Sequence, residues 1–162
     1  MRAMAVKPLI DQESMAAWTG FLRVHAALVD VLGRELEHET GLPLSWYDVL
    51  AQLAAAPDGR LRMQDLATAV VLSKSGLTRL VDRLEAAGFV ERASCPSDRR
   101  GTYAHLTPTG AKALEAARPT HHRGIEEHFV NLVSERDLAA LRRVTDKLGD
   151  ALGLTPVPRE RC

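Results

Sequence analysis

The most constraining feature of this 162-residue sequence is one long stretch with helical periodicity, residues 14–39. The side chains of its expected buried stripe recur at spacings of three and four, as in an amphipathic α-helix. They are Trp18, Phe21, Leu22, His25, Leu28, Val29, Leu32 and Leu36. Gly41 and Pro43 end the pattern. At 1.5 Å per residue this helix is roughly 37 Å long, which exceeds the needs of one small core. We therefore expect part of the stripe to pack against a partner chain.

The composition indicates a globular protein and excludes several other classes. Hydrophobic residues make up 46% and charged residues 26% of the chain, as in soluble proteins. No run of 18 apolar residues is present, so we expect no membrane span. Arg2 and Lys7 are not followed by the apolar run of a signal peptide. Two cysteines, Cys95 and Cys162, do not make a disulfide framework, which favours a cytoplasmic protein.

The charge is zero overall but unevenly distributed. Residues 11–59 carry two basic and eight acidic side chains, a net charge of −6. Residues 60–103 carry eight basic and five acidic side chains, a net charge of +3. The neutral total argues against non-specific coating of a polyanion, whereas the basic middle permits a polyanion contact on one face.

Residues 44–107 carry the pattern of short helices followed by a β-hairpin. We expect a helix capped by Ser45, a turn at 57–59, a very short strand over 60–63, a helix over 64–70, and a helix over 73–87 that is capped by Ser73 and ended by Gly88. Two β-prone runs, 89–94 and 102–106, then flank a polar hairpin tip at 95–101.

The remaining sequence predicts further helices. Thr107 and Pro108 form an N-cap and first-turn proline, Pro119 should bend or break that helix, and Ser134 opens another. Together these elements predict a mainly α fold with a small β-wing, that is, a winged helix-turn-helix plus terminal dimerisation helices. The expected parts are a flexible arm over 1–13, dimerisation helices over 14–43 and 108–153, a winged helix-turn-helix over 44–107, and a tail over 154–162.

The expected helix 73–87 has one apolar and one cationic face. A helical rotation places Leu77, Leu80, Val81 and Leu84 on one side and Lys74, Ser75, Thr78, Arg79, Asp82 and Arg83 on the other. Arginine reads guanine edges bidentately, while Ser, Thr and Lys contact phosphates or bases. Ser73, Lys74 and Ser75 also lie at the positive end of the helix dipole, where phosphate binds. We interpret this segment as a helix for the DNA major groove; an ordinary solvated face is the alternative.

The expected hairpin tip supports this interpretation. Arg99 and Arg100 could enter an adjacent minor groove, whose negative potential favours arginine. Asp98 could orient Arg100 through a charge-assisted hydrogen bond. A short helix, a turn, a cationic helix and a cationic hairpin in this order predict a winged helix-turn-helix.

These segments resemble one known family. The run from Ser73 to Glu85, SKSGLTRLVDRLE, resembles the recognition helix of MarR-family (multiple antibiotic resistance) regulators, and GFVER at 88–92 resembles the segment after it. Asp98-Arg99-Arg100 and the run LTPTG at 106–110 match that family's wing and the start of its next helix. The resemblance covers about residues 14–150, and the ordered series is far more specific than any one motif.

The resemblance implies a homodimeric transcriptional regulator, with interlocked terminal helices and paired winged domains on a near-palindromic operator in double-stranded DNA. It implies that a small ligand, often an aromatic or phenolic acid, releases the DNA from a pocket between dimer helices and winged domain, so we expect a repressor. By position, Ser73, Lys74, Ser75, Thr78, Arg79 and Arg83 would be the major-groove set. Asp98 and Arg100 match the wing's Asp-x-Arg, and Arg99 would contact phosphate. The first helix lacks the cysteine of the family's redox-sensing branch.

Further residues are candidates for sensing. Trp18, His25, Trp46 and Asp48 are candidates for the ligand pocket, although ordinary packing is the favoured interpretation of Trp46. Cys95 lies near Arg92 and Arg99 in the sequence, and cations lower thiol pKa values, but a bystander thiol is the favoured interpretation.

A metal-responsive regulator is one alternative. His121, His122, Glu126 and His128 cluster near Pro119, and His122 and Glu126 are four residues apart, a possible zinc-binding pair. No compact set of four ligands is present, so we expect no metal and no cofactor. A helical protein-interaction dimer is another alternative, in which Arg79 and Arg83 would be replaceable by Ala without consequence. We find no paired carboxylates in a recognisable setting, no phosphate-binding loop and no nucleophile elbow, so we expect no enzyme.

Overall fold

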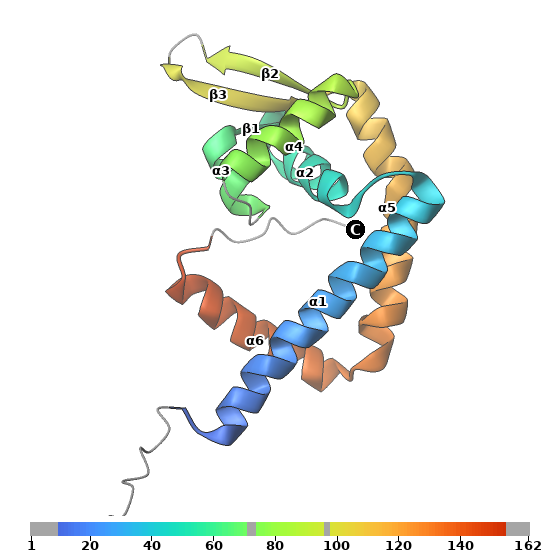
Figure 1. The fold of residues 1–162 in the computed structure, drawn as a ribbon, viewed down its shortest axis with the longest axis vertical. Helices are drawn as coiled ribbons and strands as arrows, with labels where there is room; N and C mark the ends of the chain where they lie inside the picture. The colour runs from blue at the N-terminus through green and yellow to red at the C-terminus, as the bar shows by residue number, and fades with distance from the viewer. Residues whose placement is uncertain (1–9, 71–73, 96–97, 155–162) are drawn as a thin grey trace, which may run out of the picture.

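The computed structural model describes residues 10–70, 74–95 and 98–154, with only the backbone described at 74, 94–95 and 98–101 (Figure 1). The helices are α1 (Gln12–Thr40), α2 (Leu44–Ala55), α3 (Met63–Ala69), α4 (Lys74–Ala86), α5 (Pro108–His128) and α6 (Glu135–Ala151). The strands are β1 (Arg60–Arg62), β2 (Val90–Cys95) and β3 (Asp98–Leu106), and short 3₁₀ turns span Pro57–Gly59 and Val130–Leu132. The predicted fold class, mainly α with a small β-wing, is confirmed.

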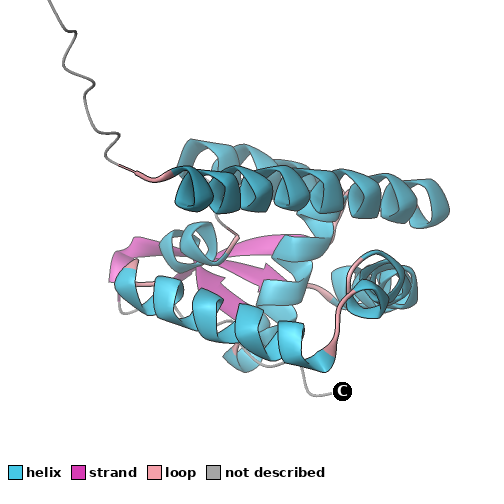
Figure 2. Ribbon diagram, turned by 90° about the horizontal axis from the view of Figure 1, so that it is seen from below, coloured by secondary structure: helices cyan, strands magenta, loops and turns pink. Residues whose placement is uncertain are grey.

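The elements form a winged unit beside a layer of long helices. Figure 1 shows α2, α3, α4 and the sheet together at one end, and α1 and α5 side by side below them. The sheet is antiparallel in the order β1-β3-β2. Figure 2 shows the long helices lying as separate rods outside the part that contains the strands.

The core of the winged unit lies between α2, α3, α4 and the sheet. Each helix contributes leucine or valine from one face only, as amphipathic periodicity requires. The fully buried side chains include Val49, Leu50, Leu53, Leu66, Leu77, Val81, Leu84 and Val90, joined by Leu36 of α1 and Leu114 of α5. This core fixes the orientation of α4, because α4 has no other apolar face to bury.

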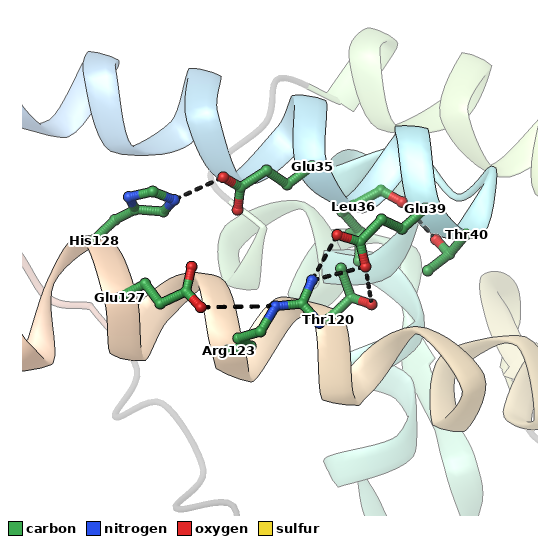
Figure 3. A network of polar contacts seen from close by, with 8 residues as sticks. All are labelled: Glu35, Leu36, Glu39, Thr40, Thr120, Arg123, Glu127 and His128. Carbon is green, nitrogen blue, oxygen red and sulfur yellow. Dashed lines mark hydrogen bonds and ion pairs between the residues drawn. The ribbon is translucent and has the colours of Figure 1, made fainter.

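Polar contacts join α1 to α5 near the winged unit (Figure 3). Glu39 accepts hydrogen bonds from Arg123 Nη2 at 2.6 and 2.7 Å and from the Thr120 hydroxyl at 3.1 Å. One helical turn earlier, Glu35 Oε1 lies 2.7 Å from His128 Nε2. The helices also approach closely beside these contacts, and a Cβ at Gly124 would lie 2.7 Å from Leu32 Cδ2.

Much of the apolar surface of α1 and α6 is exposed. On α1, Trp18, Phe21 and Val29 are 57%, 52% and 46% exposed, and on α6, Val144 and Leu148 are each 53% exposed. The most apolar 18-residue window of α1 has a mean hydropathy of 1.3, sufficient by length and composition alone to cross a membrane. Core helices of soluble proteins pass the same test, but none of this window is buried within the single chain.

Three expectations about element boundaries were wrong. Ser45 does not cap α2, because the Pro43 carbonyl already accepts hydrogen bonds from the amides of Trp46 and Tyr47, and the helix begins at Leu44. Pro119 does not break α5, which continues to His128 because the adjacent Ala117 and Thr120 are buried. The predicted tip at 95–101 is shorter than expected, since residues 98–101 belong to β3.

Candidate DNA-binding surface

The apolar face of α4 directs its polar face outward. Leu77, Leu80, Val81 and Leu84 are at most 3% exposed, as the helical rotation predicted. Ser75, Thr78, Arg79, Asp82 and Arg83 are exposed on the other side. Within the described part of the chain, Arg79 and Arg83 make no ion pair. Two guanidinium groups and two hydroxyls are therefore presented on one side of a helix that is held by its core contacts.

The helix before α4 supports it from behind. Leu66 and Ala67 of α3 are buried against the same core, and α3 packs on α4. The connecting residues 71–73, and with them the predicted cap Ser73, lie outside the described residues. The side chain of Lys74 is likewise not described. Two short packed helices followed by a sheet are the arrangement of a helix-turn-helix with a wing.

The wing is the hairpin of β2 and β3. The strands pair from Val90 opposite Leu106 to Ser94 opposite Thr102, and the register shifts between Ser94 and Cys95. Asp98, Arg99 and Arg100 begin β3, and their side chains lie outside the described part, as does that of Cys95. The hairpin thus carries the predicted Asp-Arg-Arg run at its far end.

Sequence reasoning missed the role of Arg92. This arginine of β2 makes an ion pair with Asp82 at 2.6 Å and a second with Glu85 at 2.5 Å, both on α4. It also donates to the carbonyl oxygen of Thr78 at 3.2 Å. The GFVER run at 88–92 contained the residue, but only the fold shows which helix its side chain faces.

A second arginine cluster lies on the other face of the sheet. Arg62 Nε donates to the Tyr103 hydroxyl at 2.9 Å, and the guanidinium carbons of Arg60 and Arg62 lie 6.0 and 5.5 Å from the centre of the Tyr103 ring. Arg60 also pairs with Asp58 at 3.5 Å. These contacts join β1 to β3 and leave a cationic, aromatic surface on the wing sheet.

A pocket of about 620 Å³ opens where the long helices meet the winged unit. It is lined by His25, Tyr47, Asp48, Ala51, Gln52, Ala69, Val70, His121, His122 and Ile125. Two of the four predicted pocket residues, His25 and Asp48, are in this set. Trp18 is not, because it lies on the exposed stripe of α1. Trp46 instead packs edge-on against Phe89, with ring centres 5.8 Å apart.

Comparison with known proteins decides the family. Residues 40–101 match the sequence model of the MarR family. The crystal structure of AbsC, a MarR family transcriptional regulator from Streptomyces coelicolor, is 32% identical and superposes with a TM-score of 0.82, over 90% of this chain and 98% of that one. This chain belongs to the MarR family.

Two other relatives extend the comparison. Sco3205 from Streptomyces coelicolor, whose crystal structure is in complex with DNA, is 29% identical with a TM-score of 0.83, over 97% of this chain and 99% of that one. The HTH-type transcriptional regulator MhqR of Bacillus subtilis is 25% identical over 86% of this chain and 94% of its own length. As a MarR-family member, the chain is a DNA-binding transcriptional regulator and not an enzyme, as predicted.

The pocket of this MarR-family chain has an unusual carboxyl group. Asp48 lines the pocket and keeps solvent-exposed surface, yet the surrounding protein atoms desolvate its carboxylate and raise its pKa to about 6. The imidazole of His121 lies with its ring centre 4.3 Å from that of Tyr47. The pocket contains three imidazoles, a phenol and a carboxyl group whose pKa is about 6. These groups offer both hydrogen-bond donors and acceptors to a small molecule.

The histidines proposed as zinc ligands do not converge. His128 faces Glu35 of α1, whereas His121 faces Tyr47 of α2. Among the residues that the structure describes, no group of three or more His, Cys, Asp or Glu side chains is placed to hold a metal ion. The zinc-responsive alternative therefore gains no support from the arrangement of these side chains.

Proposed function

We propose that this MarR-family chain is a cytoplasmic homodimeric repressor that inserts α4 of each subunit into the major groove of a near-palindromic operator. The observation that carries the proposal is the exposed face of α4. It combines hydroxyls with Arg79 and Arg83, and buried leucines hold it outward. Such side chains contact phosphates and read guanine edges.

The contacts are assigned by position. Ser73, Lys74, Ser75, Thr78, Arg79 and Arg83 form the major-groove set. Arg100, oriented by Asp98, enters the flanking minor groove, and Arg99 contacts phosphate. The support is their order along a helix and the adjoining hairpin, the two elements that a winged helix-turn-helix brings to DNA. Replacing Arg100 by Ala should weaken binding most at sites with a narrow A·T minor groove, whereas equal loss on all sequences would leave only a phosphate contact.

The dimer is supported by the exposed apolar stripes of α1 and α6. Side chains such as Trp18, Phe21 and Leu148 are about half exposed in a single subunit, and large exposed apolar patches mark interaction surfaces. A second copy would cover both stripes and would place two α4 helices on one face. Half-sites about 34–36 Å apart, one turn of DNA, are then expected.

A small aromatic or phenolic ligand is proposed to release the DNA. The pocket supports this, because its lining includes His25 and Asp48 together with Val70, the last described residue before the connection to α4. A ligand there would contact both the long helices and the helix-turn-helix. A thermal-shift screen with phenolic acids, followed by DNA titration with the hits, tests it. Ligands that stabilise the protein but leave DNA affinity unchanged would argue against regulation from this pocket.

DNA binding can be tested with two single substitutions, each of which removes one positive charge. Arg79→Ala should weaken operator binding at least about tenfold, the scale of one lost bidentate base contact. Lys112→Ala, an exposed position of α5, should have little effect. Fluorescence anisotropy would measure both on duplexes that the unmodified protein selects from a random library, across a range of salt concentrations. If Arg79→Ala and Arg83→Ala bind as the unmodified protein does, α4 is not the DNA-reading element, and a protein-interaction dimer becomes the better hypothesis.

A further inference from the structure

Arg92 makes contacts along nearly two turns of α4 from a neighbouring strand. It lies opposite Ala104 in the β2–β3 ladder, and Ala104 is fully buried, so this side of the sheet faces the core and α4. Its guanidinium reaches the Asp82 and Glu85 carboxylates and the Thr78 carbonyl oxygen. Its backbone amide also donates to Glu85 Oε1 at 3.1 Å.

The geometry of this cluster requires an arginine. Thr78, Asp82 and Glu85 are spaced four and three residues apart and therefore lie along one side of the helix. The planar guanidinium presents several donors in a fixed fork, whereas a lysine ammonium is a single flexible point. Three attachment points along α4 fix both its tilt and its rotation relative to the wing.

The ion pair between Arg92 and Asp82 also affects the charge that α4 presents to DNA. Asp82 follows Arg79 and precedes Arg83 on the exposed side of α4, and its side chain is 56% exposed. A carboxylate there repels phosphates unless a cation neutralises it. The Arg92 side chain is only 24% exposed, so it is poorly placed to contact DNA itself.

We infer that Arg92 is a positioning residue for operator recognition, which fixes α4 relative to the wing and neutralises the acidic residues of α4 without contacting DNA. This inference rests on the proposed function. It goes beyond that function because it assigns sequence discrimination to a residue behind the DNA-reading surface. The two carboxylate partners are 56% and 40% exposed, and ion pairs with exposed partners add little stability, so we expect the effect of Arg92 to fall on geometry more than on folding.

The decisive variant is Arg92→Lys, which keeps the charge and removes the fork. Its affinity would be measured for the duplex that the unmodified protein enriches most strongly and for a scrambled duplex of equal length. We expect the ratio of the two affinities to fall about tenfold or more, the scale of one misread base pair. Affinity for the scrambled duplex and its salt dependence should change little, because no phosphate contact is lost.

A matched control is Arg118→Lys, which alters another partly buried arginine, 27% exposed and paired with Glu115 of the same helix, α5. It should leave the affinity ratio unchanged. Thermal unfolding of both variants checks the fold. If Arg92→Lys does not fold, Asp82→Asn removes the partner on the more exposed side and should also lower the ratio.

The outcomes separate the two levels of the hypothesis. If the unmodified protein enriches no duplex, the proposed function fails. If it does, and folded Arg92→Lys discriminates sequences as well as the unmodified protein, Arg92 has no positioning role. If affinity for both duplexes falls equally, so that their ratio is unchanged, Arg92 contributes to DNA affinity in general and not to discrimination, and the inference is overturned.

Discussion

One glycine shows how closely single residues fix the junction between α4, the wing and α5. A Cβ at Gly110 would lie 2.1 Å from the carbonyl oxygen of Phe89, inside any van der Waals contact. Thr107 holds the same corner, because its hydroxyl donates to the Gly88 carbonyl at 2.7 Å and its amide to that of Phe89 at 3.1 Å. The run LTPTG at 106–110 therefore combines an N-cap with a close backbone approach.

This contact gives a stability prediction. Gly110→Ala should destabilise the protein by about 3 kcal/mol, the upper range for overpacking, because the obstructing atom belongs to the backbone. Gly33→Ala is the matched control: its Cβ would meet Leu44 Cβ at an ordinary 3.7 Å. It should stabilise by about 0.5–1 kcal/mol, since glycine is costly inside a helix. Urea unfolding measures both, and equal effects would contradict the close approach at Gly110.

Asp48 gives a prediction about pH. Its pKa is raised from 3.8 to about 6 by desolvation, so the folded chain binds this proton more tightly than the unfolded chain. Stability from this group therefore falls as pH rises from about 4 through 6. Asp48→Asn removes the penalty and should raise the melting temperature at pH 7–8, with the difference vanishing near pH 4. A difference that stays constant across this range would show that desolvation of the carboxylate is not its cause.

At the scale of single residues, the sequence predicted the core positions that helical periodicity determines. Leu77, Leu80 and Leu84 were assigned to the core because a single helix rotation separates them from the polar side chains. The role of Arg92 was not predictable, because its partners lie 7 to 14 residues away on another element. Trp18 was proposed for the pocket, but it lies on a surface that a single chain leaves uncovered.

At the scale of helices and strands, polar contacts pair α1 with α5, the two long helices that connect to the winged unit. The Arg123 guanidinium and the Thr120 hydroxyl hold the pKa of Glu39 below its usual value. A carboxylate with a lowered pKa contributes stability above its unfolded pKa, near 4.5, and loses that stability as the pH falls through its folded value.

A comparison of two glutamates on α1 tests this pairing. Glu39→Gln should lower the melting temperature modestly at pH 7, because it removes the ion pair with Arg123. The deficit should shrink as the pH falls below 4.5, since the unmodified side chain then becomes neutral as well. Glu37→Gln, an exposed position on the same helix, should have little effect at any pH. Equal shifts for both variants would assign no special role to Glu39.

The sequence predicted where helices begin better than whether a helix continues without interruption. Ser134 caps α6, and Thr107 with Pro108 opens α5, as the local sequence predicted. The cap of α1 at Asp11 was not predicted, because the helix was expected to begin at Ser14 after a flexible arm over 1–13. The sequence predicted a bend or break at Pro119 because a proline inside a helix removes one backbone hydrogen bond. Packing of α5 against α1 outweighs that loss, and packing is determined by residues far away in the chain.

For the whole molecule, the exposed stripes of α1 and α6 predict assembly. Leu148→Glu should dissociate the proposed dimer, because burial of a leucine contributes about 1.5–3 kcal/mol in each subunit. Ala139→Glu introduces the same side chain on the opposite side of α6, as its helical rotation shows, and should leave the dimer intact. Sedimentation velocity measures the mass. DNA affinity should fall only for the Leu148 variant, and a monomeric unmodified protein would contradict the prediction.

The tight corner at Gly110 has a mechanical consequence for this regulator. Thr107 and Gly110 hold the start of α5 against Gly88 and Phe89, the residues that directly follow α4. A tilt of α5 would then rotate the winged unit about the corner at Gly110, and the parts of the unit farthest from this corner would move most. A ligand in the proposed pocket would then need only a small rotation of the long helices to displace α4 from the proposed major-groove contact.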